Sequence, residues 1–94
     1  MESEKLLERK FNRTIKSAGG WALKLLPGII SGLPDRIALL PGGVVVFAEI
    51  KTTGEKPRKI QTYVHKKIRN LGFKVYVIDT TKDILQIIKD YENR

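Results

Sequence analysis

Residues 32–51 read GLPDRIALLPGGVVVFAEIK, and this stretch decides the fold. Its second part, residues 44–51, is rich in β-branched and aromatic side chains, which favour a strand. Residues 36–40 predict another strand, and the intervening Pro41-Gly42-Gly43 has the composition of a hairpin connection. Two neighbouring antiparallel strands are therefore expected in this part of the chain.

The elements on either side of this hairpin follow from hydrophobic spacing and from turn signals. Helices are predicted over residues 3–18 and 58–71 and after residues 80–83, which resemble a capping box; further strands are predicted over residues 21–26 and 74–78. The order is α-β-β-β-α-β-α in a single domain, residues 1–94. A three-strand meander followed by a helical crossover to a fourth strand predicts an α/β fold, with a central mixed four-stranded sheet flanked by helices.

The composition narrows the kinds of site that the chain can build. It has no cysteine and one histidine, His65, so disulfides are excluded and a zinc site made of side chains is not expected. A metal ion would be held mainly by oxygen ligands, which favours Mg²⁺ or Mn²⁺. The first ten residues, MESEKLLERK, lack the apolar core of a signal peptide. Without a membrane-length apolar run either, the protein is expected to be cytoplasmic, with no membrane partner.

Positive charge is concentrated in one segment of the chain. The net charge is +8, and residues 51–74 contain eight basic residues against Glu55 alone. A localised basic segment is typical of a protein that binds a polyanion, although a solvated helix face would give the same pattern. Phosphate-backbone contacts are predicted for Lys56, Arg58, Lys59, Lys66 and Lys67.

Two carboxylates and a lysine stand where they could act together. Asp35 precedes one predicted strand, and Glu49 lies near the end of the next, two residues before Lys51. Neighbouring strands lie about 5 Å apart, and alternation places Glu49 and Lys51 on one face, with the Ile50 carbonyl between them. This arrangement suits metal-assisted cleavage of a phosphodiester. The plainer reading is a turn-capping Asp35 and a solvent-facing pair of Glu49 and Lys51.

These motifs resemble the virus-type replication-repair nuclease domain, VRR-NUC, a branch of the PD-(D/E)xK superfamily with a restriction-endonuclease-like fold. The resemblance rests on Gly32-Leu33-Pro34-Asp35-Arg36, residues 46–51 (VFAEIK), residues 57–61 (PRKIQ) and residues 71–75 (LGFKV), and also on residues 7–11 and 19–24. Nearly the whole chain is covered. The chain resembles the stand-alone phage and bacterial members.

The resemblance implies a role for each matching residue. Asp35 and Glu49 would be metal ligands, with the Ile50 carbonyl as a further ligand. Lys51 would position or activate the attacking water, and Gln61 would sit close to the same site. The family also places a glutamate from the first helix at the metal, for which the sequence offers Glu8, with Glu4 one turn earlier as the reserve candidate.

Two cations fall near the predicted site, and the single histidine is a further candidate. Lys24 and Arg36 are candidates for phosphate contacts, although a cation flanking a strand is the default interpretation. His65 could serve as a general base, but a lone histidine in a basic helix more commonly faces DNA or solvent.

The implied activity is metal-dependent, structure-selective cleavage of DNA. By resemblance, the substrate would be branched DNA such as a four-way (Holliday) junction, and the enzyme would be a homodimer without a small-molecule cofactor. Apolar residues of the C-terminal helix are compatible with a dimer: Ile84, Ile87, Ile88 and Tyr91. The alternatives are a catalytically inactive nucleic-acid-binding module on the same fold, or a nuclease for flap, nicked or single-stranded substrates.

Overall fold

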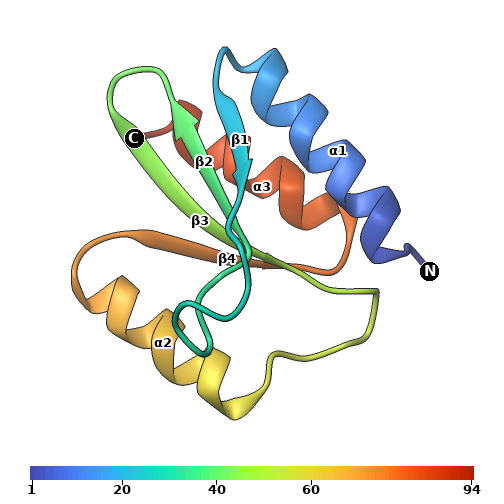
Figure 1. The fold of residues 1–94 in the computed structure, drawn as a ribbon. Coiled ribbons are helices and arrows are strands. Elements are labelled where there is room, and N and C mark those ends of the chain that lie inside the picture. Colours follow the sequence, from blue (N-terminus) through green and yellow to red (C-terminus); the bar gives the residue numbers. More distant parts are fainter.

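The structure, a computed structural model, describes all 94 residues. Its elements are α1 (Glu4–Ser17), β1 (Trp21–Lys24), β2 (Arg36–Leu40), β3 (Val44–Ile50), α2 (Lys59–Asn70), β4 (Lys74–Ile78) and α3 (Thr81–Glu92) (Figure 1). The predicted order and the α/β class are confirmed. The first strand ends two residues earlier than predicted, because the chain turns away from the sheet after Leu25 to form a long β1–β2 loop.

The four strands form one mixed sheet in the order β1-β2-β3-β4. The first three strands are antiparallel neighbours, and β4 runs parallel to β3 after the crossover through α2. In the hairpin, Arg36 pairs with Ala48. One step further along the same register, Asp35 stands opposite Glu49, so pairing of the two strands already brings the two acidic residues together.

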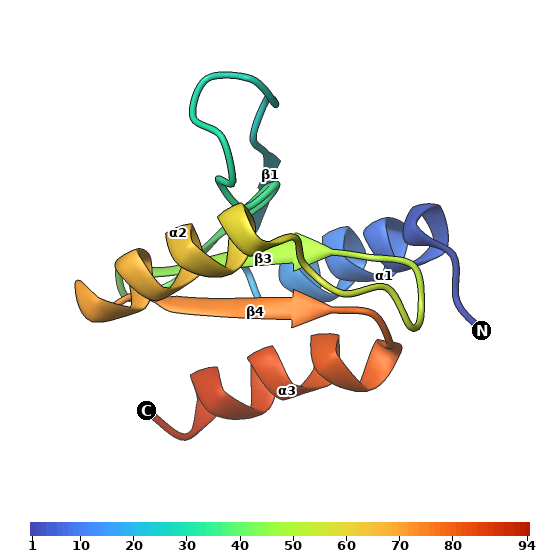
Figure 2. The ribbon, with the colours of Figure 1, turned by 90° about the horizontal axis from the view of Figure 1, so that it is seen from below.

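The helices cover the two faces of the sheet unequally. Helices α1 and α3 pack against each other and share the apolar core, whereas α2 lies on the other side of β4 from α3 (Figure 2). Leu7, Phe11 and Ile15 of α1 recur every fourth residue and are fully buried. The buried residues of α2 are instead polar: Gln61 and His65. None of the three helices has the length and apolar composition needed to cross a bilayer.

The dimer surface suggested for the C-terminal helix requires a correction. Ile84 and Ile87 are fully buried in the chain's own core, and Ile88 and Tyr91 pack against it. The apolar stripe of α3 is therefore used within one copy of the chain. The exposed leucine of this helix is Leu85.

Residues near the N-terminus fasten the segment that follows β3. The backbone of Glu2 exchanges hydrogen bonds with Thr53, and its carboxylate accepts from Lys10 Nζ at 2.7 Å and from the Thr81 backbone N–H at 2.7 Å. These partners hold the pKa of Glu2 at about 2, with Lys10 as the largest influence. The turn after Lys51 and the start of α3 are thus both hydrogen-bonded to Glu2.

A close contact fixes the end of the β1–β2 loop against α2. Gly32 has φ = +86°, and a Cβ added there would lie 2.6 Å from the Ile60 carbonyl oxygen and 2.9 Å from Val64 Cγ2. Glycine is needed both for the left-handed backbone and for the close approach. Two residues later, Pro34 is fully buried, so the backbone leading into Asp35 is held in place.

Replacing Gly32 by alanine is expected to destabilise the protein by about 2–4 kcal/mol, from left-handed strain plus steric overlap with α2. Gly28→Ala is the matched control, because Gly28 has φ = +93° and nothing within 4 Å of an added Cβ. It should lose only about 1–2 kcal/mol. Urea denaturation of both variants measures the difference, and equal losses would show that the contact with α2 contributes nothing.

Candidate active site

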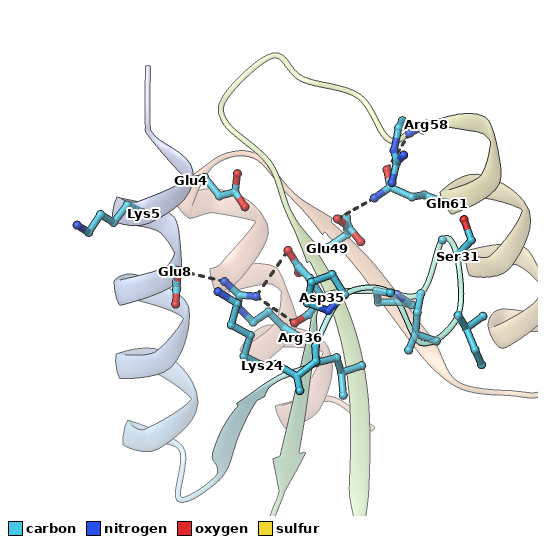
Figure 3. A pocket seen from close by; sticks show the side chains of 18 residues that line it. Glu4, Lys5, Glu8, Lys24, Ser31, Asp35, Arg36, Glu49, Arg58 and Gln61 are labelled. Atoms are coloured by element: carbon cyan, nitrogen blue, oxygen red, sulfur yellow. Dashed lines mark hydrogen bonds and ion pairs between the residues drawn. The ribbon is translucent and has the colours of Figure 1, made fainter.

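Asp35 and Glu49 lie side by side where β2 begins and β3 ends (Figure 3). Asp35 Oδ1 accepts a hydrogen bond of 3.2 Å from the backbone N–H of Ile50. This bond crosses from one strand to the other, so Asp35 does not simply cap its own turn. It holds the carboxylate beside the backbone segment that carries Glu49, Ile50 and Lys51.

The Glu49 side chain is enclosed by polar groups from its own strand and from α2. Only 3% of the residue is exposed, which rules out a solvent-facing pair with Lys51. Its Oε2 accepts from Gln61 Nε2 at 3.1 Å and lies 3.5 Å from Lys51 Nζ. Its Oε1 is buried and has no hydrogen-bond partner. A buried carboxylate oxygen without a partner is costly unless something positive binds it.

Helix α2 presents two polar side chains to Glu49. Gln61 lies as close to the site as predicted, and its Oε1 also accepts from the Arg58 backbone N–H at 2.8 Å. The expectation that His65 faces DNA or solvent is wrong, because His65 is buried with Nε2 3.7 Å from Glu49 Oε1. The signal that could have placed it is its position four residues after Gln61, which puts both on one helix face.

Arg36 requires a second correction. It was a candidate for a phosphate contact, with a strand-flanking cation as the default interpretation, but its side chain is buried, with Nη2 3.1 Å from Glu8 Oε2 and Nη1 3.6 Å from Asp35 Oδ2. Nη1 also donates to the Asp35 carbonyl oxygen at 3.0 Å. Arg36 points toward α1 because alternation along β2 directs it to the covered face of the sheet. It therefore connects α1 to the site instead of facing a substrate.

The two glutamates of α1 are placed differently. Glu8 is paired with Arg36, and its role as a metal ligand stays a prediction. Glu4, the reserve candidate, lines the same cleft and is one of the charges that raise the pKa of Asp35. Figure 3 shows both side chains on the side of α1 that faces the site.

Asp35 has a pKa raised to about 6. Burial is the largest cause, followed by the negative charge of Glu49; Arg36 and the Ile50 N–H act in the opposite direction. Two carboxylates that repel one another in a partly buried site gain stability when a cation binds between them. The electrostatics therefore favour a positively charged ligand here.

A cleft of about 660 Å³ opens over these residues. Asp35, Glu49 and Gln61 line it together with residues of the β1–β2 loop. Exposed cations also line it: Lys5, Lys24 and Arg58. Lys24 thus lies near the site as expected, whereas nothing in the sequence singled out Lys5. The remaining basic candidates, Lys56, Lys59, Lys66 and Lys67, are exposed on α2 and the segment before it.

The residues fit a hard divalent cation with few protein ligands. No group of three or more acidic or histidine side chains converges closely enough to hold a metal by side chains alone. Two carboxylates plus a backbone carbonyl match Mg²⁺, which keeps several waters and binds through one or two carboxylates. The partnerless Glu49 Oε1 and the raised pKa of Asp35 are the observations that support such an ion.

Known proteins are similar to this chain over 90% or more of its length. No protein-family profile matches the chain. It is 34% identical over 85 residues to "Putative nuclease p44" of Acyrthosiphon pisum secondary endosymbiont phage 1, covering 90% of each chain. Among solved structures it is similar to a "VRR_NUC domain", with a TM-score of 0.84, 28% sequence identity and coverage of 96% of this chain and 99% of that one.

Proposed function

Because the chain belongs to the VRR-NUC family of nucleases, a branch of the PD-(D/E)xK superfamily, we propose that it is a divalent-metal-dependent endodeoxyribonuclease. Its proposed substrate is branched DNA such as a four-way (Holliday) junction. One observation carries the proposal: Asp35 and Glu49 face each other across β2 and β3, next to Lys51, with the buried Glu49 Oε1 lacking a partner. A module that only binds DNA has no need of this arrangement.

Asp35, Glu49 and the Ile50 carbonyl would hold Mg²⁺ or Mn²⁺. When bound, such an ion supplies Lewis-acid polarisation of the phosphate and activation of water. The chain's own groups prepare the ligands. Gln61 fixes Glu49 Oε2, and the Ile50 N–H fixes Asp35 Oδ1. Glu8, or Glu4 on the preceding turn of α1, would complete the site through water.

Lys51 is the proposed catalytic lysine. Its ammonium group lies 3.5 Å from Glu49 Oε2 and is only partly exposed. From there it can orient the attacking water and stabilise the negative charge that develops on the phosphate. Its position directly after β3, beside the carboxylates, favours this role over a contact to distant DNA backbone.

The basic residues around the cleft would bind the DNA backbone. Lys24 and Arg58 lie at the cleft itself, and Lys56, Lys59, Lys66 and Lys67 add exposed positive charge on α2 and on the segment before it. Such contacts recognise charge and shape and carry little base information. A homodimer, with one active site for each of two strands, is part of the proposal. We place the enzyme in the cytoplasm of a bacterial cell or an infected host cell.

A cleavage assay tests the chemistry and the selectivity together. A labelled four-way junction and a linear duplex of matching sequence are each incubated with Mg²⁺, with Mn²⁺ and with chelator. Metal-dependent cutting of the junction, at least about 10-fold faster than of the duplex, is expected if shape is recognised. Sedimentation velocity of the same protein tests for the mass of a dimer.

Each outcome of this assay has a distinct meaning. Equal cutting of both substrates would leave the nuclease activity in place and remove the junction preference. Binding without cutting under every metal condition would contradict the proposed chemistry and favour the inactive binding module. Cutting that persists in chelator would exclude the metal-dependent mechanism.

A further inference from the structure

The β1–β2 loop ends in an exposed apolar tip, residues 26–30. Its aliphatic side chains are uncovered: Leu26 is 71% exposed, Ile29 76% and Ile30 58%. Figure 2 shows the loop standing clear of the rest of the molecule, on the side where α2 lies. Single exposed apolar residues are ordinary, but three on one loop mark a surface that contacts something.

The base of this loop is fixed to the active site. Leu25 donates a backbone hydrogen bond of 2.8 Å to the carbonyl oxygen of Asp35, and Gly32 lies against the start of α2. The tip is therefore carried by a braced stem, not by a free linker. Leu26 and Ile30 line the same cleft as Asp35 and Glu49. Whatever reaches the two carboxylates also meets the tip.

The surroundings of the tip indicate the chemistry of its partner. Besides its carboxylates, the cleft is lined by the exposed cations Lys5, Lys24 and Arg58. With a divalent cation bound at Asp35 and Glu49, the cleft carries net positive charge, so the partner carries negative charge alongside apolar surface. Nucleic acid has both, because its backbone is anionic and the faces of its unstacked bases are apolar. Aliphatic side chains are known to insert between base steps, unstacking and kinking the duplex. A second copy of the chain fits less well, since three side chains are far below the area that a stable dimer needs.

We propose that residues 26–30 form a wedge that inserts into DNA at the base step beside the phosphate to be cut. This inference rests on the proposed function and adds a reason for its selectivity. In an intact duplex the wedge must first unstack a base step. At a branch, a nick or a mismatch the stack is already interrupted, so those structures are cut faster.

The first test reads base unstacking without cleavage. The fluorescent base 2-aminopurine, which brightens when unstacked, is placed at a fully paired step in a junction arm, next to the branch, and mixed with a Lys51→Ala protein. Fluorescence is expected to rise, and the rise is expected to be lost when Ile29→Ser and Ile30→Ser are added. Leu71→Ser is the matched control, because Leu71 is 74% exposed and lies outside the cleft. An equal rise with the serine pair overturns the wedge.

The second test uses cleavage rates of the otherwise wild-type protein. The Ile29→Ser/Ile30→Ser variant is expected to lose about 10-fold or more in kcat/KM on the fully paired substrate, and to recover when a mismatch opens the step beside the cut. Unchanged rates, or an equal loss on both substrates, would contradict the wedge. A shift of this variant from dimer to monomer in sedimentation would overturn it in favour of a contact between copies. Failure of the wild-type protein to cut any DNA would instead contradict the proposed function, and the fluorescence test would still decide the wedge.

Discussion

Replacing Lys51 by alanine is expected to slow DNA cleavage by about 1,000-fold, because the variant loses the group that orients water and stabilises developing charge. Glu49 keeps its hydrogen bond from Gln61, so this proposed metal ligand stays in place. Junction affinity should remain close to that of the wild type. Single-turnover cleavage and gel-shift binding on the same junction separate the two effects.

Two further variants make the Lys51 result specific. Lys16→Ala removes the same charge from an exposed position on α1 outside the cleft, and its cleavage rate should match the wild type. Lys51→Arg keeps the charge but changes its shape, and it should recover only part of the activity. If Lys51→Ala cut at the wild-type rate, this lysine would have no catalytic role.

Replacing Asp35 by asparagine should abolish metal-dependent cleavage and yet make the metal-free protein more stable at neutral pH. The pKa of Asp35 is about 6 in the folded protein against an ordinary value of 3.8. Between these values the unfolded chain has already released the proton that the folded chain keeps, so folding stability falls as pH rises from about 4 to about 6. Asparagine can still accept from the Ile50 N–H and carries no charge. The expected gain at pH 7.5 is about 1–3 kcal/mol.

The pH dependence distinguishes this effect from a general change in packing. Urea denaturation without metal should give nearly equal stabilities for wild type and Asp35→Asn near pH 3.5, and a growing advantage for the variant through about pH 6. Saturating Mg²⁺ should narrow that advantage, because only the wild type binds the ion well. A variant less stable than wild type at pH 7.5 would show that the carboxylate is not repelled in the folded state.

The sequence was sufficient for the parts of the site that one hairpin determines. Residues 36–40 and 44–50 form neighbouring antiparallel strands as predicted, and their register alone places Asp35 opposite Glu49. The alternation of a strand put Lys51 on the same side as Glu49, which their 3.5 Å separation bears out. Membership of the VRR-NUC family was also predicted correctly from these short motifs.

Properties that depend on packing between distant elements were not accessible in this way. Arg36 looked like a free cation, but α1 covers it and supplies Glu8 as its partner. His65 looked exposed because the apolar residues of α2 were assumed to face inward. The helix instead turns Gln61 and His65 toward Glu49, while Ile60 stays 39% exposed and Leu71, just after the helix, 74% exposed. An amphipathic helix usually buries its apolar face, but α2 covers a polar site and buries polar side chains there.

The hydrogen bonds of Glu2 to Thr53 and Thr81 have a consequence for how the protein folds during its synthesis on the ribosome. The partners of Glu2 lie 51 and 79 positions later in the chain. The full set of hydrogen bonds around Glu2 can therefore form only after Thr81 has left the exit tunnel, although the β2–β3 hairpin can pair much earlier. Contacts so distant in sequence are formed late in folding. Catalytic competence should consequently appear in the nascent protein as a late and abrupt event, not as a gradual gain.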